Sequence, residues 1–242
     1  MPRGMGHDLI RVGDDVALAA LAAERWLDMV EAAAQAGRPH RVALAGGRIT
    51  KRFLERVAQR SIERAIRLDG VDFFWGDERC VPPADPESNF RLAQDSLLTR
   101  MGVSVERIHR VLGELDPATA AAMAEQDLRR TTGVDGDAMP VLDLVFLGMG
   151  EDAHVASLFP GALPEVTESS AVYVPATGPK PPPRRVSLTF RALAAAAEVW
   201  VLASGAGKEP ALKASLTPES GTPLGRVLRE RARTFVFTDI PA

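Results

Sequence analysis

Short apolar runs that alternate with helical patterns are the feature that most restricts how this chain can fold. The runs at His40–Ala45, Val71–Trp75 and Val199–Ala203 each lead into a turn that contains glycine, and helical patterns follow them along the chain. Strands that alternate with helices through short connections are typical of a parallel sheet covered by helices on both faces. We therefore predict an α/β fold, namely a three-layer α/β/α sandwich with a mostly parallel, Rossmann-like sheet.

The other elements follow from apolar spacing and from residues that start or end helices. Helices are expected at Asp14–Ala36, Thr50–Arg60, Ser88–Leu98 (with Ser88 as its cap) and Pro117–Arg130, and after Lys208. Further strands are expected at Ile108–Leu112, Val141–Leu147, Ala171–Val174, Arg185–Phe190 and Thr234–Thr238, with a polar loop at Gly76–Glu87. No repeat or clear boundary divides the chain, so we expect a single domain over residues 1–242.

Composition limits the partners that this chain can take. A net charge of −3 offers no excess of positive charge to displace counterions from nucleic acid. The single cysteine, Cys80, excludes an intrachain disulfide. No segment approaches the roughly 20 apolar residues of a membrane span, and Met1–Asp8 holds no apolar signal core. We expect a cytoplasmic protein with a small-molecule partner, no nucleic acid and no membrane, as a monomer or small homo-oligomer.

The strongest candidate for chemistry is the glycine-rich loop Leu147–Gly161, which follows the apolar run Val141–Phe146. Open parallel sheets place their ligands at the carboxyl ends of the strands, where such a loop would lie. The loop holds Asp152 and His154, two residues apart. An imidazole beside a carboxylate is a good general base near neutral pH. The sequence therefore predicts an enzyme with His154 at its centre.

Two further loops offer ligands for an anion. Gly46 and Gly47 let the backbone approach a ligand closely, and the helix that follows supplies unpaired N–H groups. An ordinary tight turn is the alternative for this pair of glycines. The next residue, Arg48, either holds phosphate with its side chain or points away. Lys208 stands at the start of a helix, where the macrodipole disfavours a cation, and this favours an anionic ligand.

The loop after Trp75 carries the triplet Asp77, Glu78 and Arg79. A planar guanidinium such as that of Arg79 binds phosphate or a developing oxyanion. Asp77 either orients that arginine or contacts sugar hydroxyls. A solvated ion pair within the triplet is the alternative.

The remaining reactive side chains are expected to be structural. His7, His40 and His109 have no carboxylate in a sequence context like that of His154, so each is expected to be a hydrogen-bonded structural residue. Ser157 lacks the Gly-x-Ser-x-Gly elbow of a nucleophile. No group of histidine, cysteine and acidic residues has metal-ligand spacing, so we predict a site with no metal.

Several of these segments resemble one enzyme family. The loop Leu147–Gly161 resembles the signature of the 6-phosphogluconolactonases, Gly-x-Gly-x-Asp-Gly-His followed by Ala-Ser-Leu-Phe-Pro-Gly. Trp75–Val81, Lys180–Thr189 and Gly205–Lys208 resemble further family segments in the family's order. Ala153 stands where the second motif glycine is usual, which costs about 1 kcal/mol or more if the backbone there has positive φ.

The resemblance implies a hydrolase of the pentose phosphate pathway. The reaction would convert 6-phospho-D-glucono-1,5-lactone to 6-phosphogluconate in the oxidative branch, with no cofactor. The residues that the resemblance places at the reacting end are His154 as the base that activates water, Asp152 as its partner and Arg79 beside the carbonyl oxygen. The residues that would bind substrate or phosphate are Gly46, Gly47, Arg48, Asp77, Arg185 and Lys208.

Two other functions are alternatives to the lactonase. Sugar-phosphate isomerases and amino-sugar-phosphate deaminases have a similar Asp-Gly-His loop that continues into Phe-Asn-Glu-Pro-Gly, whereas the segment Ser157–Gly161 has neither the asparagine nor the acid. A non-catalytic sugar-phosphate-binding protein is the other alternative. Its support is Ala153 and the loop Arg48–Lys51, which replaces the small hydroxyl residues that usually follow the two glycines.

Overall fold

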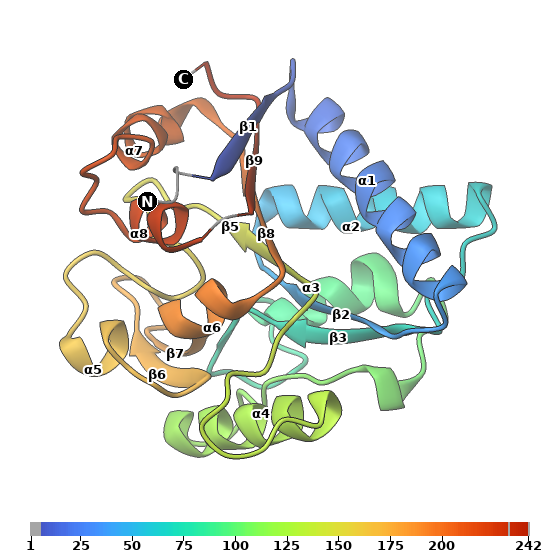
Figure 1. The fold of residues 1–242 in the computed structure, drawn as a ribbon, viewed down its shortest axis with the longest axis horizontal. Helices are drawn as coiled ribbons and strands as arrows, with labels where there is room; N and C mark the ends of the chain where they lie inside the picture. The colour runs from blue at the N-terminus through green and yellow to red at the C-terminus, as the bar shows by residue number, and fades with distance from the viewer. Residues whose placement is uncertain (1–5, 232, 242) are drawn as a thin grey trace.

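The computed structural model describes residues 6–231 and 233–241, and its centre is a six-stranded sheet in which every neighbouring pair is parallel. The strands, in their order across the sheet, are β1 (His7–Arg11), β9 (Thr234–Thr238), β8 (Glu198–Ala203), β5 (Leu144–Gly148), β2 (His40–Leu44) and β3 (Val71–Trp75). Figure 1 shows these strands between the helices. The predicted α/β fold with a parallel sheet is confirmed.

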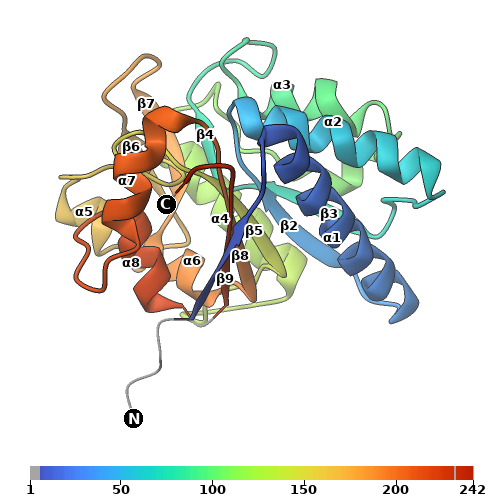
Figure 2. The ribbon, with the colours of Figure 1, turned by 90° about the horizontal axis from the view of Figure 1, so that it is seen from above.

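Helices cover both faces of this sheet. Helices α1 (Asp15–Gln35) and α2 (Arg48–Glu63) pack together on one side, and Figure 2 shows the shorter helices of the C-terminal half on the other. An aromatic cluster joins the first two helices to the sheet. The ring of Phe146 in β5 lies 5.7 Å from that of Trp26 in α1 and 4.6 Å from that of Phe53 in α2, centroid to centroid. This packing fixes the start of α2 beside the end of β5.

The remaining helices are short except for one. They are α3 (Asn89–Ala93), α4 (Pro117–Thr132), α5 (Pro164–Thr167), α6 (Phe190–Ala195), α7 (Glu209–Ser215) and α8 (Pro223–Glu230). A π-helical turn, Gln94–Leu98, continues α3, and 3-10 turns lie at Val105–Arg107 and Ala206–Lys208. Within residues 6–231 and 233–241, no helix has the length and hydropathy of a membrane span.

A second sheet was not predicted. Strands β4 (Asp77–Arg79), β7 (Arg184–Leu188) and β6 (Tyr173–Thr177) pair antiparallel, in that order. The sequence predicted a loop where β4 lies, because β4 is short and polar. It also included β6 and β7 in a β-α alternation. The connection 178–183 between them holds no helix, so they form an antiparallel hairpin, since a parallel pair needs a longer crossover.

Several boundaries also differ from prediction. Strand β1 was missed, and the expected strand Ile108–Leu112 reduces to one bridge between Ile108 and Phe73. The helix expected from Thr50 begins at Arg48, directly after the two glycines. The cap at Ser88 is confirmed, since its hydroxyl accepts a hydrogen bond from the N–H of Arg91.

Candidate active site

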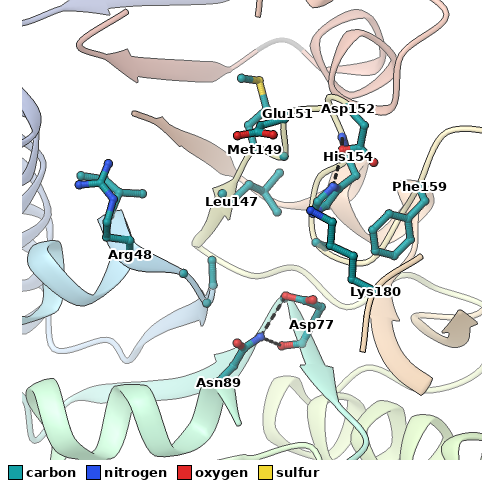
Figure 3. Close-up of a pocket in the computed structure, with 18 of the residues that line it drawn as sticks. Arg48, Asp77, Asn89, Leu147, Met149, Glu151, Asp152, His154, Phe159 and Lys180 are labelled. Atoms are coloured by element: carbon teal, nitrogen blue, oxygen red, sulfur yellow. Dashed lines mark hydrogen bonds and ion pairs between the residues drawn. The ribbon is translucent and has the colours of Figure 1, made fainter. Parts of the chain in front are cut away.

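Loops from four parallel strands meet at one edge of the large sheet and line a cleft of about 900 Å³. They follow the carboxyl ends of β2, β3, β5 and β8, where ligands bind in open α/β sheets. The small sheet and the segment 178–183 close another side of the cleft (Figure 3). The structure brings all the predicted site residues together in its lining: Gly46, Gly47, Arg48, Asp77, Arg79, Asp152, His154, Arg185 and Lys208.

The ring of His154 is held by Asp152. Nδ1 of the ring lies 2.5 Å from Oδ1 of the carboxylate, and the backbone N–H of His154 donates to the same oxygen at 3.2 Å (Figure 3). Burial raises the pKa of Asp152, but the hydrogen bonds from His154 outweigh it and leave the pKa below its usual value. A carboxylate at Nδ1 favours the tautomer with its proton there. Nε2 is then the nitrogen left for a substrate.

Gly150 permits this close pair. A Cβ atom at Gly150 would lie 2.1 Å from Nδ1 of His154 and 2.5 Å from Oδ1 of Asp152. The N–H of Gly150 also donates to the carbonyl of His154 at 2.9 Å, which closes the loop on itself. Any larger residue would therefore displace either the ring or the carboxylate.

The other end of the cleft is a site of unpaired donors and positive charge. Gly47, with φ of 96°, caps the N-terminus of α2 without any side-chain hydrogen bond, so the first N–H groups of the helix are free toward the cleft. Nζ of Lys208 has no hydrogen-bond or ion-pair partner within the described part of the chain. Burial lowers the pKa of Lys208, and the nearby charge of Arg48 lowers it further. A bound anion would offset both the desolvation of Lys208 and its repulsion from Arg48.

Arg79 and Arg185 stand opposite each other on β4 and β7. The guanidinium of Arg79 donates from one nitrogen to the carbonyl of Glu87 at 2.7 Å and to its carboxylate at 3.3 Å. Arg185 is 8% exposed and donates to the carbonyls of Pro182 and Lys180, at 3.2 and 3.4 Å. Both arginines line the cleft, but each is already held by its own loop.

Asp77 connects two other segments of the chain through hydrogen bonds. One of its oxygens accepts a hydrogen bond from the hydroxyl of Ser157 at 2.6 Å, and the other accepts from the amide of Asn89 at 3.3 Å. Of the two roles considered for Asp77, the orientation of Arg79 falls to Glu87 instead, and contact with sugar hydroxyls stays a prediction. Asp77 still lines the cleft, while Ser157 is fully buried with its hydroxyl engaged.

Comparison with known proteins identifies the family. Residues 13–236 match the family described as glucosamine-6-phosphate isomerases/6-phosphogluconolactonase. The chain belongs to this family. It is 37% identical to the 6-phosphogluconolactonase of Streptomyces coelicolor, covering 92% of this chain and 88% of the relative. It is 35% identical to that of Mycobacterium tuberculosis, covering 95% of each. The solved structure of the 6-phosphogluconolactonase from Trypanosoma cruzi superposes with a TM-score of 0.83 at 27% identity, covering 97% of this chain and 95% of that one.

The two departures from the family motifs have structural consequences. Ala153 has φ of 64°, so the backbone does take the left-handed conformation that favours glycine there, and the strain considered from the sequence is present. Arg48 remains at the cleft, with NH1 bound to the carboxylate of Asp15 at 2.7 Å. Its NH2 lies 3.7 Å from where a Cβ of Gly205 would be, on the turn that leads to Lys208. Arg48 thus lines the cleft beside the turn that leads to Lys208.

Sequence reasoning missed several cleft residues. Phe159 packs its ring 4.6 Å from that of His154, and Glu151 and Lys180 also line the cleft. The family motif includes Phe159, and the scarcity of lysine marks Lys180, so signals for both were present. Glu78 was passed over as well. It is buried and accepts hydrogen bonds from the N–H groups of Arg79, Asn89 and Phe90, while burial raises its pKa to about 7.

Two histidines outside the cleft are structural, as predicted. Nε2 of His40 accepts a hydrogen bond from the indole of Trp26 at 3.0 Å, and burial lowers the pKa of His40 to about 4. His109 has a carboxylate partner that is distant in the sequence: its Nδ1 lies 2.8 Å from Asp127. Burial lowers the pKa of His109, but Asp127 and Asp72 outweigh burial and raise it to about 9. Nδ1 of His7, in β1, finds no partner among residues 6–231 and 233–241.

Proposed function

We propose that this protein is a 6-phosphogluconolactonase, a carboxylic-ester hydrolase that converts 6-phospho-D-glucono-1,5-lactone to 6-phosphogluconate in the oxidative branch of the pentose phosphate pathway. The observation that carries this proposal is the His154–Asp152 pair at one end of a cleft whose other end holds an unpaired lysine and a free helix N-terminus. The names of its relatives support the same activity. The partner of the protein is this small molecule. We propose that the protein acts on it in the cytoplasm, as a monomer or a small homo-oligomer.

His154 acts as the general base. Its Nε2 takes a proton from water as the oxygen of that water attacks the lactone carbonyl. The ester bond then breaks, and the proton passes from the imidazolium to the ring oxygen that leaves. Asp152 stabilises the imidazolium, because its carboxylate already bonds Nδ1 at 2.5 Å. A positioned base of this kind contributes roughly 10²- to 10⁴-fold to the rate.

The phosphate of the substrate occupies the opposite end. Arg48 lies across the cleft from His154 (Figure 3), and its charge acts on nearby Lys208. These two side chains and the first N–H groups of α2 are the groups proposed to bind the phosphate. Arg79, which ends β4 and lines the cleft, is the arginine that we assign to the carbonyl end. Binding energy from the remote phosphate then holds the lactone in the position that the base requires.

The competing functions have less support than the lactonase. An isomerase or deaminase would need the acid that those enzymes carry after the histidine, and residues 155–161 contain none. A non-catalytic binding protein would not need the tight His154–Asp152 pair. Its one structural support is the strained Ala153, which nevertheless leaves that pair in hydrogen-bond contact.

A turnover assay tests the proposal directly. The purified protein, without added metal, is expected to accelerate hydrolysis of freshly made 6-phosphogluconolactone over the spontaneous rate, and a chelator is expected to leave that rate unchanged. No acceleration would favour the binding protein. Activity lost with the chelator and restored by one metal would overturn the metal-free mechanism.

A further inference from the structure

The segment 178–183, between β6 and β7, brings a further cation into the cleft. Lys180 and its neighbours Pro179 and Pro181 line the cleft, and Figure 3 shows the side chain of Lys180 extending toward the ring of His154. Lys208 lies on a different loop and at the other end. The cleft therefore has one lysine for each end.

Hydrogen bonds to the backbone hold this segment in place. The N–H of Gly178 donates to the carbonyl of Pro183 at 2.7 Å and closes the segment at its base. Nε of Arg185 donates to the carbonyl of Pro182, and NH2 donates to that of Lys180. The prolines on both sides of Lys180 fix φ in this stretch. The backbone of Lys180 is thus set before any substrate binds.

Arg185 also joins this segment to the histidine loop. Its guanidinium lies 5.8 Å from the centre of the ring of Phe159, which packs against His154. A Cβ at Gly178 would come within 2.7 Å of Nε of Arg185 and 3.2 Å of the Phe159 ring, so the segment rests directly on both side chains. Burial lowers the pKa of Arg185, and the charge of Arg79 lowers it further. Because Nε and NH2 of Arg185 both donate to carbonyls of the segment 178–183, this side chain can hold the segment in position.

We propose that Lys180 is a catalytic residue at the carbonyl end of the lactone and that Arg185 is its positioning residue. This rests on the lactonase function proposed above. As the water oxygen bonds to the carbonyl carbon, the electron pair of the C=O bond moves to oxygen, and the ammonium of Lys180 donates a hydrogen bond to that oxyanion. His154 holds the proton of the water. The pair returns as the ring C–O bond breaks, and the proton goes to the ring oxygen.

Substitution of Lys180 separates the two ends of the cleft. Lys180→Met is expected to lower kcat roughly 10²-fold, as for loss of one oxyanion donor, and by the same factor for 6-phosphogluconolactone and for unphosphorylated gluconolactone. Lys180→Arg is expected to restore part of the loss. Lys213→Met is the matched control, since Lys213 pairs with Glu209 on α7 away from the cleft. A loss confined to the phosphorylated lactone would overturn the proposal, because Lys180 would then bind phosphate.

A binding measurement without turnover tests the placement of Lys180. Lys180→Met is expected to weaken the binding of 6-phosphogluconate, whose carboxylate occupies the carbonyl end, by roughly 10-fold, as for loss of a charge-assisted hydrogen bond, and to leave the binding of inorganic phosphate unchanged. An unchanged affinity for 6-phosphogluconate would overturn the placement. If the unaltered protein fails to hydrolyse the lactone while this affinity still falls in Lys180→Met, the lactonase function and the catalytic role of Lys180 are both refuted, and only the position of Lys180 at this end of the cleft remains.

A double substitution tests the role of Arg185. If Arg185 acts through Lys180, Arg185→Gln is expected to lower kcat, yet Lys180→Met with Arg185→Gln is expected to be no slower than Lys180→Met alone. Two losses that multiply in the double variant would mean that Arg185 acts independently, which overturns its positioning role.

Discussion

The two ends of the cleft are built in opposite ways. At the histidine end the groups other than Lys180 are already paired: Asp152 bonds His154, Glu87 bonds Arg79, and carbonyls bond Arg185. At the Lys208 end the lysine and the first N–H groups of α2 have no such partners within the described residues. One end is therefore organised before the substrate arrives, and the other still carries the electrostatic cost of unpaired charge.

This difference indicates which end of the cleft serves catalysis and which serves substrate binding. A base and its orienting carboxylate must hold one geometry through the reaction, so they benefit from a rigid setting. A dianionic phosphate binds wherever several donors and cations converge, and it satisfies them as it does so. Changes at the histidine end are thus expected to act on kcat, and changes at the Lys208 end on KM.

Removal of the base is expected to have the largest effect. His154→Ala should lower kcat by roughly 10²- to 10⁴-fold, while binding of 6-phosphogluconate, measured by calorimetry, should persist because the phosphate contacts lie on other loops. Asp152→Asn should cause a smaller loss, because the base remains. Circular dichroism must show a folded protein. A folded His154→Ala variant with near-normal kcat would refute the mechanism.

Removal of the unpaired lysine is expected to act at the other end. Lys208→Ala should raise KM for 6-phosphogluconolactone roughly 10- to 100-fold, the usual range for loss of a charge-assisted hydrogen bond. Unphosphorylated gluconolactone should be affected little. Steady-state kinetics on both substrates measure the difference. Equal losses on the two would mean that Lys208 does not contact the phosphate.

Part of each end of the cleft could be predicted from the sequence. Each predicted loop follows an apolar run and carries its chemistry within a few residues, as Asp152 and His154 do. Such local signals were enough to predict the parallel sheet and part of the lining of the cleft. Arg48 and Ala153 were recognised as departures, but their conformations came only with the structure.

What the sequence could not predict depends on contacts between distant segments. Strand β4 is polar and gains its strand conformation from pairing with β7, more than a hundred residues later. Asp127 reaches His109 from the following helix α4, and Ser157 reaches Asp77 from the histidine loop. Apolar periodicity carries no information about such polar pairs, because each partner alone has the appearance of an ordinary surface residue.

A smaller effect is expected from the anchor of Arg48. Asp15 is in the first turn of α1 and bonds Arg48 at 2.7 Å. Asp15→Asn should raise KM for the phosphorylated lactone about 2- to 5-fold, in keeping with a partly exposed ion pair, and should leave kcat unchanged. Glu55→Gln, which removes the exposed partner of Lys51, is the control. If Asp15→Asn raises KM equally in an Arg48→Ala background, Asp15 does not act through Arg48.

The smallest effect concerns the strain at Ala153, and it is best measured against another alanine. Ala153 and Ala43 in β2 are both almost fully buried, but only Ala153 has positive φ. Replacement by glycine removes a buried methyl group and adds chain entropy to the unfolded state at both sites. At Ala153 it also relieves the left-handed conformation, which costs about 1 kcal/mol or more for alanine. Urea denaturation should therefore show that Ala153→Gly lowers the free energy of unfolding about 1 kcal/mol less than Ala43→Gly does. Equal losses would mean that the histidine loop holds Ala153 without strain.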